Sequence, residues 1–155
     1  MRSAPALEVA LFREQGIRFP LPLCAVLLAE IEDELGRFEH ALAILDDALA
    51  DAERTGQHHF DVELHRQHGA LLLRKTPSDV AAAEAAFMRA IEVARSQQTR
   101  TFELGAAMSL ARLWRSQGKP QQARELLAPV YGWFTEGFDT LDLKEAKALL
   151  EELAT

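Results

Sequence analysis

A single cysteine and the shortness of the apolar runs exclude several classes of protein. Because Cys24 stands alone, the chain has no intramolecular disulfide and no zinc site built on cysteines, which favours a reducing, cytoplasmic compartment. The longest apolar stretch, Leu21 to Ala29, contains Pro22 and is far shorter than the roughly 20 residues that span a bilayer. No apolar stretch of signal-peptide length follows Arg2. We therefore expect a cytoplasmic protein that has no membrane partner.

Basic residues and low-complexity segments are also scarce. The 17 lysines and arginines face 24 aspartates and glutamates, and a net charge of −7 argues against a protein that neutralises nucleic-acid phosphates. Eight glycines and six prolines exclude collagen-like chains. With 48% hydrophobic and 26% charged residues, 155 residues predict one globular domain.

Strand signals are missing, but an internal repeat is present. The chain has no sustained apolar–polar alternation and no Asn-Gly or Asp-Gly turn. Segments 12–31, 52–72 and 94–114 align, and small residues recur at offsets of 40 and 42. These small residues are Ala29, Gly69 and Ala111 in one set, and Ala41, Ala83 and Ala123 in the other. Because two antiparallel helices pack closely only where side chains are small, we predict that these six positions hold three helix pairs together.

Start and stop signals predict the bounds of the helices. In 76–79, Thr-Pro-Ser-Asp is typical of a helix N-terminus, and Gly-Lys-Pro in 118–120 ends one helix and begins the next. The predicted helices are 5–15, 20–35, 38–55, 60–75, 77–97, 101–117, 120–131 and 140–153. We expect a single domain over 1–155, with the second helix of a partial repeat at 5–16. Repeats follow at 20–55, 60–97 and 101–131, and 140–153 is a cap helix.

This pattern resembles tetratricopeptide repeats, which have small residues at fixed positions and a glycine between the two helices of each repeat. The matching residues are Leu28, Ala29, Gly36, Ala41, Leu45 and Ala48 in the first pair, Gly69, Ala83, Phe87 and Ala90 in the second, and Leu110, Ala111, Trp114, Gly118, Ala123 and Leu127 in the third. The resemblance implies an all-α, right-handed α-α superhelix of about three pairs, with a leading helix and a C-terminal capping helix. The longer period, the insertion within 74–79 and the missing proline at the end of each second helix depart from the family.

Three longer segments, 63–73, 85–97 and 109–153, are similar to a narrower group. They resemble the C-terminal repeat region of bacterial proteins that join a nucleotide-cyclase domain, an AAA-type ATPase module and a tetratricopeptide tail. Gly132 and Gly137 have the spacing of a phosphate-binding loop, but Phe138 and Asp139 replace its lysine and hydroxyl residue. The resemblance therefore implies an interaction or regulatory region in bacterial signal transduction, with no enzyme activity and no cofactor.

The resemblance to tetratricopeptide repeats also implies that the first helix of each pair lines a concave groove, which would bind a protein partner or a neighbouring domain. The charged groove residues are Glu30, Asp33, Glu63, Arg66, Arg74, Arg112 and Arg115. Other groove positions include Leu23, Val26, Gly105 and Met108. The four arginines could clamp an acidic peptide or a small anionic effector, since guanidinium groups pair with carboxylates. The alternative is that Glu30 and Glu63 pair with Arg66 and Arg112 on neighbouring helices. A third hypothesis is a homodimer through the helix at 5–15.

Two further clusters have competing interpretations. His65 and His68 lie three residues apart on one helical face, but no third metal ligand shares it, so we expect packing and no metal site. A partly buried histidine favours its neutral form. The aromatic residues of 131–138 form either an exposed docking patch or a filler between the last pair and the cap helix. These aromatic residues are Tyr131, Trp133, Phe134 and Phe138.

Overall fold

The computed structural model describes residues 21–155, and every regular element in that range is an α-helix. The helices are α2 (Leu21–Glu34), α3 (Phe38–Thr55), α4 (Asp61–Lys75), α5 (Val80–Gln97), α6 (Arg100–Ser116), α7 (Pro120–Gly132) and α8 (Leu141–Ala154). The all-α prediction is confirmed over these residues. The predicted helix at 5–15, and the homodimer contact assigned to it, lie outside the described part of the chain.

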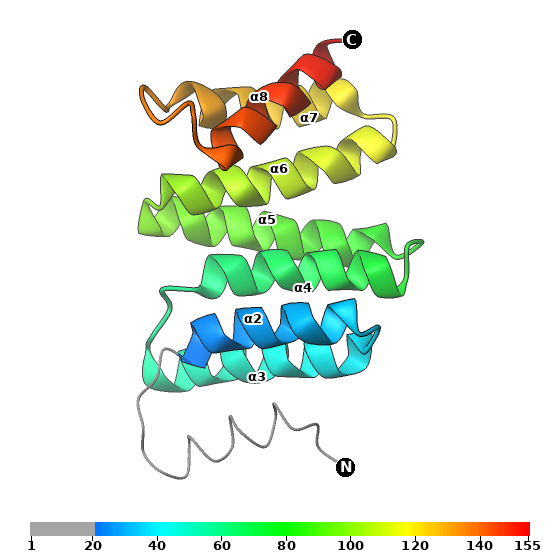
Figure 1. Ribbon diagram of the computed structural model, residues 1–155, viewed down its shortest axis with the longest axis vertical. Helices are drawn as coiled ribbons and strands as arrows, with labels where there is room; N and C mark the ends of the chain where they lie inside the picture. The colour runs from blue at the N-terminus through cyan, green and yellow to red at the C-terminus, as the bar shows by residue number, and fades with distance from the viewer. Residues whose placement is uncertain (1–20) are drawn as a thin grey trace.

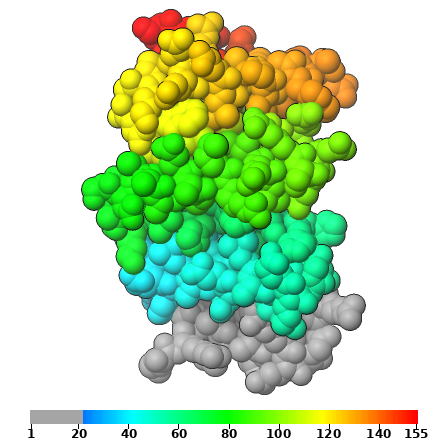
Figure 2. All heavy atoms as spheres, turned by 180° about the vertical axis from the view of Figure 1, so that it is seen from behind, coloured from blue at the N-terminus to red at the C-terminus, as the bar shows by residue number. Residues whose placement is uncertain are grey.

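The helices form two layers. Each helix packs against the next one along the chain, and α2, α4, α6 and α8 also contact one another in turn. Within residues 21–155, α3, α5 and α7 make no comparable contacts among themselves. Figure 1 shows the layer of α2, α4, α6 and α8 in front, and Figure 2 shows the opposite side, with α5 between α3 and α7.

Small residues set the distance between the two layers. The structure places all six predicted packing positions in the interior: Ala29, Ala41, Gly69, Ala83, Ala111 and Ala123. Leu45, Phe87 and Leu127 each follow an alanine by four residues, and all three are buried. Because residues four apart share one helical face, a small and a large side chain alternate along the inner face of each second helix.

The turns of the first and third pairs have the same geometry. Gly36 and Gly118 have φ values of 76° and 74°, in the left-handed region that glycine adopts most readily. The N–H of Arg37 donates to the carbonyl of Glu32 at 2.8 Å, and the N–H of Lys119 donates to that of Trp114 at 2.9 Å. Both turns therefore close in the same hydrogen-bonded C-terminal motif.

The turn of the second pair differs from the prediction. Helix α5 begins at Val80, three residues later than expected, so Thr76 is not its N-cap. The N–H of Thr76 closes α4 on the carbonyl of Leu72, and the N–H of Asp79 donates to the carbonyl of Thr76 at 3.0 Å. Pro77 takes the second position of this turn, where its fixed φ is favourable. The same four residues therefore form a connecting turn instead of a helix start.

Helix α8 continues the front layer. It packs against α7 and α6, as α4 packs against α3 and α2. Its buried side is Leu143, Ala146, Leu149 and Leu153, and these leucines belong to the main core. The helix predicted as a cap thus has the position of a first helix in a further pair.

Candidate functional site

A hollow of about 420 Å³, which we call the groove, lies on the layer of α2, α4, α6 and α8. All four helices contribute to it, and Phe60 joins them from just before α4. Its lining residues are Leu23, Val26, Phe60, Glu63, Arg66, Thr101, Phe102, Gly105, Met108, Ser109, Arg112, Asp142 and Glu145. The groove therefore combines several apolar side chains with five ionisable ones.

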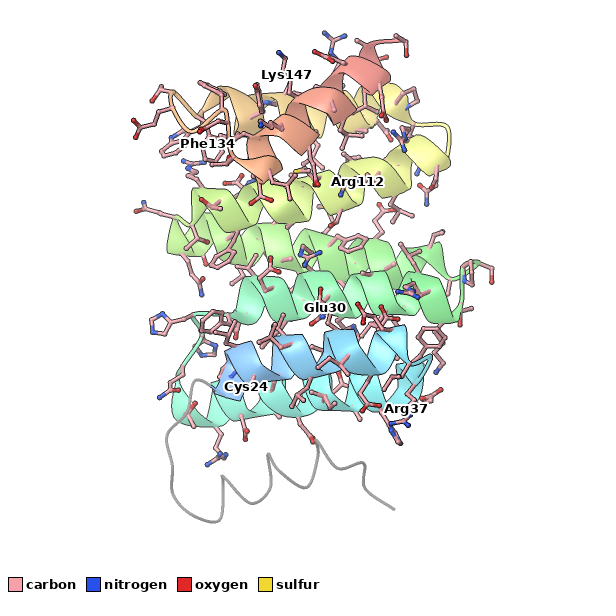
Figure 3. The ribbon with its side chains drawn as sticks, in the orientation of Figure 1. Cys24, Glu30, Arg37, Arg112, Phe134 and Lys147 are labelled. Carbon is pink, nitrogen blue, oxygen red and sulfur yellow. The ribbon has the colours of Figure 1, made fainter. Side chains whose placement is uncertain are left out.

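The charged residues predicted for the groove separate into two sets. Glu63, Arg66 and Arg112 line it, and so do the predicted apolar positions Leu23 and Met108. The other four predicted residues, Glu30, Asp33, Arg74 and Arg115, lie outside its lining. Figure 3 shows Glu30 on α2 and Arg112 on α6, on the same side of the molecule.

Arg66 is the central cation of the groove. Its Nε lies 3.1 Å from both carboxylate oxygens of Glu63, and its Nη2 lies 2.8 Å from Oε2 of the same residue. Burial by itself would lower the pKa of Arg66, but the hydrogen bonds and charge of Glu63, with the charges of Glu30 and Asp142, raise it above its ordinary value. Three carboxylates therefore act on this one guanidinium.

The other three predicted arginines are also paired. Arg112 lies 3.5 Å from Glu145 of α8, and Arg115 pairs with Glu152 of the same helix. Arg74 donates to Asp33 of α2 at 2.6 Å. These pairs join adjacent helices of the front layer. Arg66 pairs within its own helix, and neither Arg66 nor Arg112 has the inter-helix partner expected from the sequence.

The charged groups in and beside the groove that make no ion pair within residues 21–155 are carboxylates. Glu30 and Asp142 make no ion pair within 4 Å among residues 21–155, although both act on Arg66 at longer range. Together with Glu63 and Glu145, they set four carboxylates against the guanidinium groups of Arg66 and Arg112. A free arginine clamp for an acidic ligand is therefore not what this geometry offers.

Some groove residues are not singled out by the sequence. Phe60 and Phe102 line it, and they are 42 residues apart, the same offset as Gly69 and Ala111. Each phenylalanine stands three residues before a predicted groove position, Glu63 or Gly105, so extending the predicted groove by one helical turn would include both rings. Asp142 and Glu145 come from α8, whose place in the front layer no sequence signal specified.

The two histidines of the predicted cluster, His65 and His68, are partly buried and lie near carboxylate groups. Burial lowers the pKa of His65, as do the charges of Arg89 and His68, while Asp61 acts in the opposite direction. His65 is partly buried as predicted, and the direction of its pKa shift favours the neutral imidazole. His68 Nε2 lies 3.1 Å from an Asp46 oxygen. Residues 21–155 contain no group of three His, Cys, Asp or Glu side chains placed to hold a metal ion.

The aromatic loop divides between the two interpretations. Tyr131 and Phe134 pack against the main core, whereas Trp133 is 55% exposed and Phe138 is 47% exposed. Trp133 meets Phe134 edge to face, with ring centroids 5.3 Å apart, and Arg100 lies 5.3 Å from the Trp133 ring. Figure 3 shows Phe134 at the connection between α7 and α8. Two of the four rings therefore pack against the core, and the other two are exposed.

No protein-family model matches the chain, and no curated protein shows a significant match to it. Among residues 21–155, no helix combines the length and apolar character needed to cross a membrane.

Proposed function

We propose that this chain is a non-catalytic protein-interaction module whose groove binds a partner protein or a neighbouring domain. One observation carries the proposal: a single hollow is lined by four successive helices of one layer, with leucine, valine, methionine and phenylalanine side chains between ion pairs. An open hollow shared by several parallel helices suits an extended or helical segment, which contacts one helix after another. The Arg112–Glu145 pair joins α6 to α8, and beside the ion pairs Leu23 is exposed while Val26, Phe60 and Phe102 are partly exposed.

We also propose that the stack is a right-handed, tetratricopeptide-like superhelix. The alternation of contacts supports this, because each first helix meets both its own partner and the first helix of the next pair. The matching turns at Gly36 and Gly118 support it too, since repeats close their turns alike. The resemblance of 109–153 to the tails of cyclase and ATPase regulators suggests a regulatory region of a bacterial signalling protein.

Self-association is a second candidate function, and an apolar stripe along α2 and the residue that follows it favours this candidate. Leu27, Ile31 and Leu35 recur every four residues and are all exposed. In the repeat register, Ile31 corresponds to Leu71 and Leu113, which are 2% and 6% exposed, while Ile31 is 49% exposed. Contacts with a second copy would bury this stripe. Ile31→Glu should then convert a dimer to a monomer in light scattering, and a wild-type protein that is monomeric at every concentration would contradict this candidate.

Filling the groove tests the main proposal. Gly105 lines the groove, and a Cβ atom added there meets only Glu63 Oε1, at 3.9 Å, so Gly105→Phe has room at its Cβ and should place a ring in the groove. Ala50→Phe is the matched control, because Ala50 is an exposed residue of α3 in the other layer. Each protein is immobilised after circular dichroism has confirmed its helix content, and is offered to a lysate of its own cells. We expect a partner that Ala50→Phe retains and Gly105→Phe loses. Equal capture by both variants would contradict binding in the groove.

A further inference from the structure

We propose that the groove's partner is a basic segment, a peptide that carries lysine or arginine side chains around apolar residues. This inference rests on the proposed function and specifies the chemistry of its ligand. It reverses the charge expected from the sequence, where four arginines suggested an acidic partner.

The arginines are already neutralised by carboxylates of the protein itself. Arg66 makes three hydrogen-bond contacts with Glu63, and Arg112 lies 3.5 Å from Glu145. Arg74 and Arg115 pair with Asp33 and Glu152. An acidic peptide would have to displace these carboxylates and leave them beside its own negative charge.

The uncompensated charges belong to acidic residues on two sides of Arg66. Glu30 extends from α2 and Asp142 from the first turn of α8, and both are exposed. Asp142 lines the groove together with Arg66, and Glu30 lies one helical turn after Val26, which also lines it, so a cationic ligand in the groove lies near both carboxylates. Asp142 in the groove and Glu30 beside it offer a positively charged side chain two acceptors that are not held in ion pairs within residues 21–155.

The apolar part of the lining distinguishes a peptide from a small polycation. Leu23 and Val26 of α2 face the same hollow as Phe102 and Met108 of α6. These side chains gain little from a hydrated cation, but they remove water from an apolar residue of a ligand. A peptide with apolar residues between basic ones would therefore contact both the apolar lining and the carboxylates.

Selection from a random library tests the inference without knowledge of the natural partner. Phage-displayed random dodecapeptides are panned on the wild-type protein and counter-selected on Gly105→Phe. We expect the retained peptides to be enriched in Lys and Arg together with large apolar residues. An enriched peptide is then synthesised with its basic residues intact, or replaced by Gln or by Glu.

The affinities of these peptides are measured on two charge variants with the same net charge. The groove variant, Glu30→Gln/Asp142→Asn, removes the unpaired carboxylate in the groove and the one beside it, and the α3 variant, Asp47→Asn/Glu53→Gln, removes two exposed carboxylates of α3. We expect the groove variant to bind the basic peptide roughly threefold to tenfold more weakly than wild type at low salt, because exposed charge pairs are individually weak. The α3 variant should bind as wild type, and 0.5 M salt should remove most of the difference.

The outcomes separate the two proposals. Retained peptides that are acidic or uncharged, or equal affinity of the basic and Gln peptides, would overturn the basic-ligand inference and leave the groove as a binding site. If no peptide is enriched, or if enriched peptides bind Gly105→Phe as tightly as wild type, the proposed function falls and the inference falls with it.

Discussion

Gly69 of α4 faces the ring of Phe87 of α5 so closely that a methyl group on Gly69 would lie 2.8 Å from Cε1 and 2.9 Å from Cδ1. The same methyl group would lie 3.1 Å from the carbonyl oxygen of Ala83. The two distances to the Phe87 ring are shorter than the contacts that Cβ atoms make in proteins, so α4 and α5 depend on glycine at this position. The contact joins the two helices in the middle of the stack.

Substitution of Gly69 tests this contact. Gly69→Ala should lower the free energy of unfolding by about 1–3 kcal/mol, because the buried ring must move or the helices must separate. Gly105→Ala is the control, since its Cβ has open space and alanine favours a helix by about 0.5–1 kcal/mol over glycine. Urea unfolding measures both. A Gly69→Ala protein as stable as Gly105→Ala would refute the close approach.

Two buried glutamates should respond oppositely to replacement by methionine. Both carboxylate oxygens of Glu32 are buried without a hydrogen bond within the described chain, and Arg37 and His40 approach only to 3.6 Å. Glu103 is also buried, but it accepts from Arg95 at 2.9 Å and from Arg100 at 3.2 Å.

We therefore expect Glu32→Met to raise the free energy of unfolding by about 1–2 kcal/mol, since an apolar side chain avoids the desolvation of an unsatisfied carboxylate. Glu103→Met should lower it by about 1–3 kcal/mol, because charge-assisted hydrogen bonds are lost. Thermal and urea unfolding at pH 7 provide the comparison. Destabilisation by both substitutions would mean that Glu32 has a stabilising partner.

Gln98 has a conformation that glycine would adopt with less strain. Its φ is 57°, and it follows α5 as Gly56, with φ 72°, follows α3. The two positions are 42 residues apart. Gln98→Gly should raise the free energy of unfolding by up to about 1 kcal/mol. Ala85→Gly, at an exposed right-handed position of α5, should lower it by about 1 kcal/mol. The prediction fails if both substitutions destabilise the protein.

His65 should make stability depend on pH. Its pKa is lowered below the ordinary 6.5 by burial, so the folded protein binds a proton less readily than the unfolded chain. Neutral His65 makes its full contribution to the free energy of unfolding above pH 6.5. This contribution is lost as the pH falls below 6.5 toward the lower pKa that His65 has in the folded protein. His65→Gln, which does not titrate, should lose less stability than wild type between pH 7.5 and pH 5. Parallel stability curves for the two proteins would exclude this role.

The helices were largely predictable, because repeat spacing and glycine stops are local signals. Helix α3 was expected at 38–55 and spans Phe38–Thr55, while α8 was expected at 140–153 and spans Leu141–Ala154. The start of α5 was wrong because a threonine followed by proline favours both a helix N-terminus and a tight turn. Only the tertiary arrangement decides between them.

The helix faces that line the groove could be predicted from the sequence, but the pairing of the groove's charges could not. The repeat register placed Glu63, Arg66 and Arg112 on the groove, and they line it. The partners of the arginines depend on side-chain reach between helices that are far apart in sequence, such as Arg112 and Glu145. No sequence signal placed 140–153 in the front layer, so Asp142 and Glu145 were not predicted to line the groove.

An NMR titration tests the central claim of a binding groove most directly. A basic, apolar-containing dodecapeptide retained by the selection above is added to the isotopically labelled protein, and the backbone amide shifts are followed. The expected result is that the largest changes cluster around Phe60, Glu63, Phe102 and Gly105, and that they vanish in Gly105→Phe. Changes centred on α3, α5 and α7, or a spectrum that does not respond, would contradict a partner site in the groove.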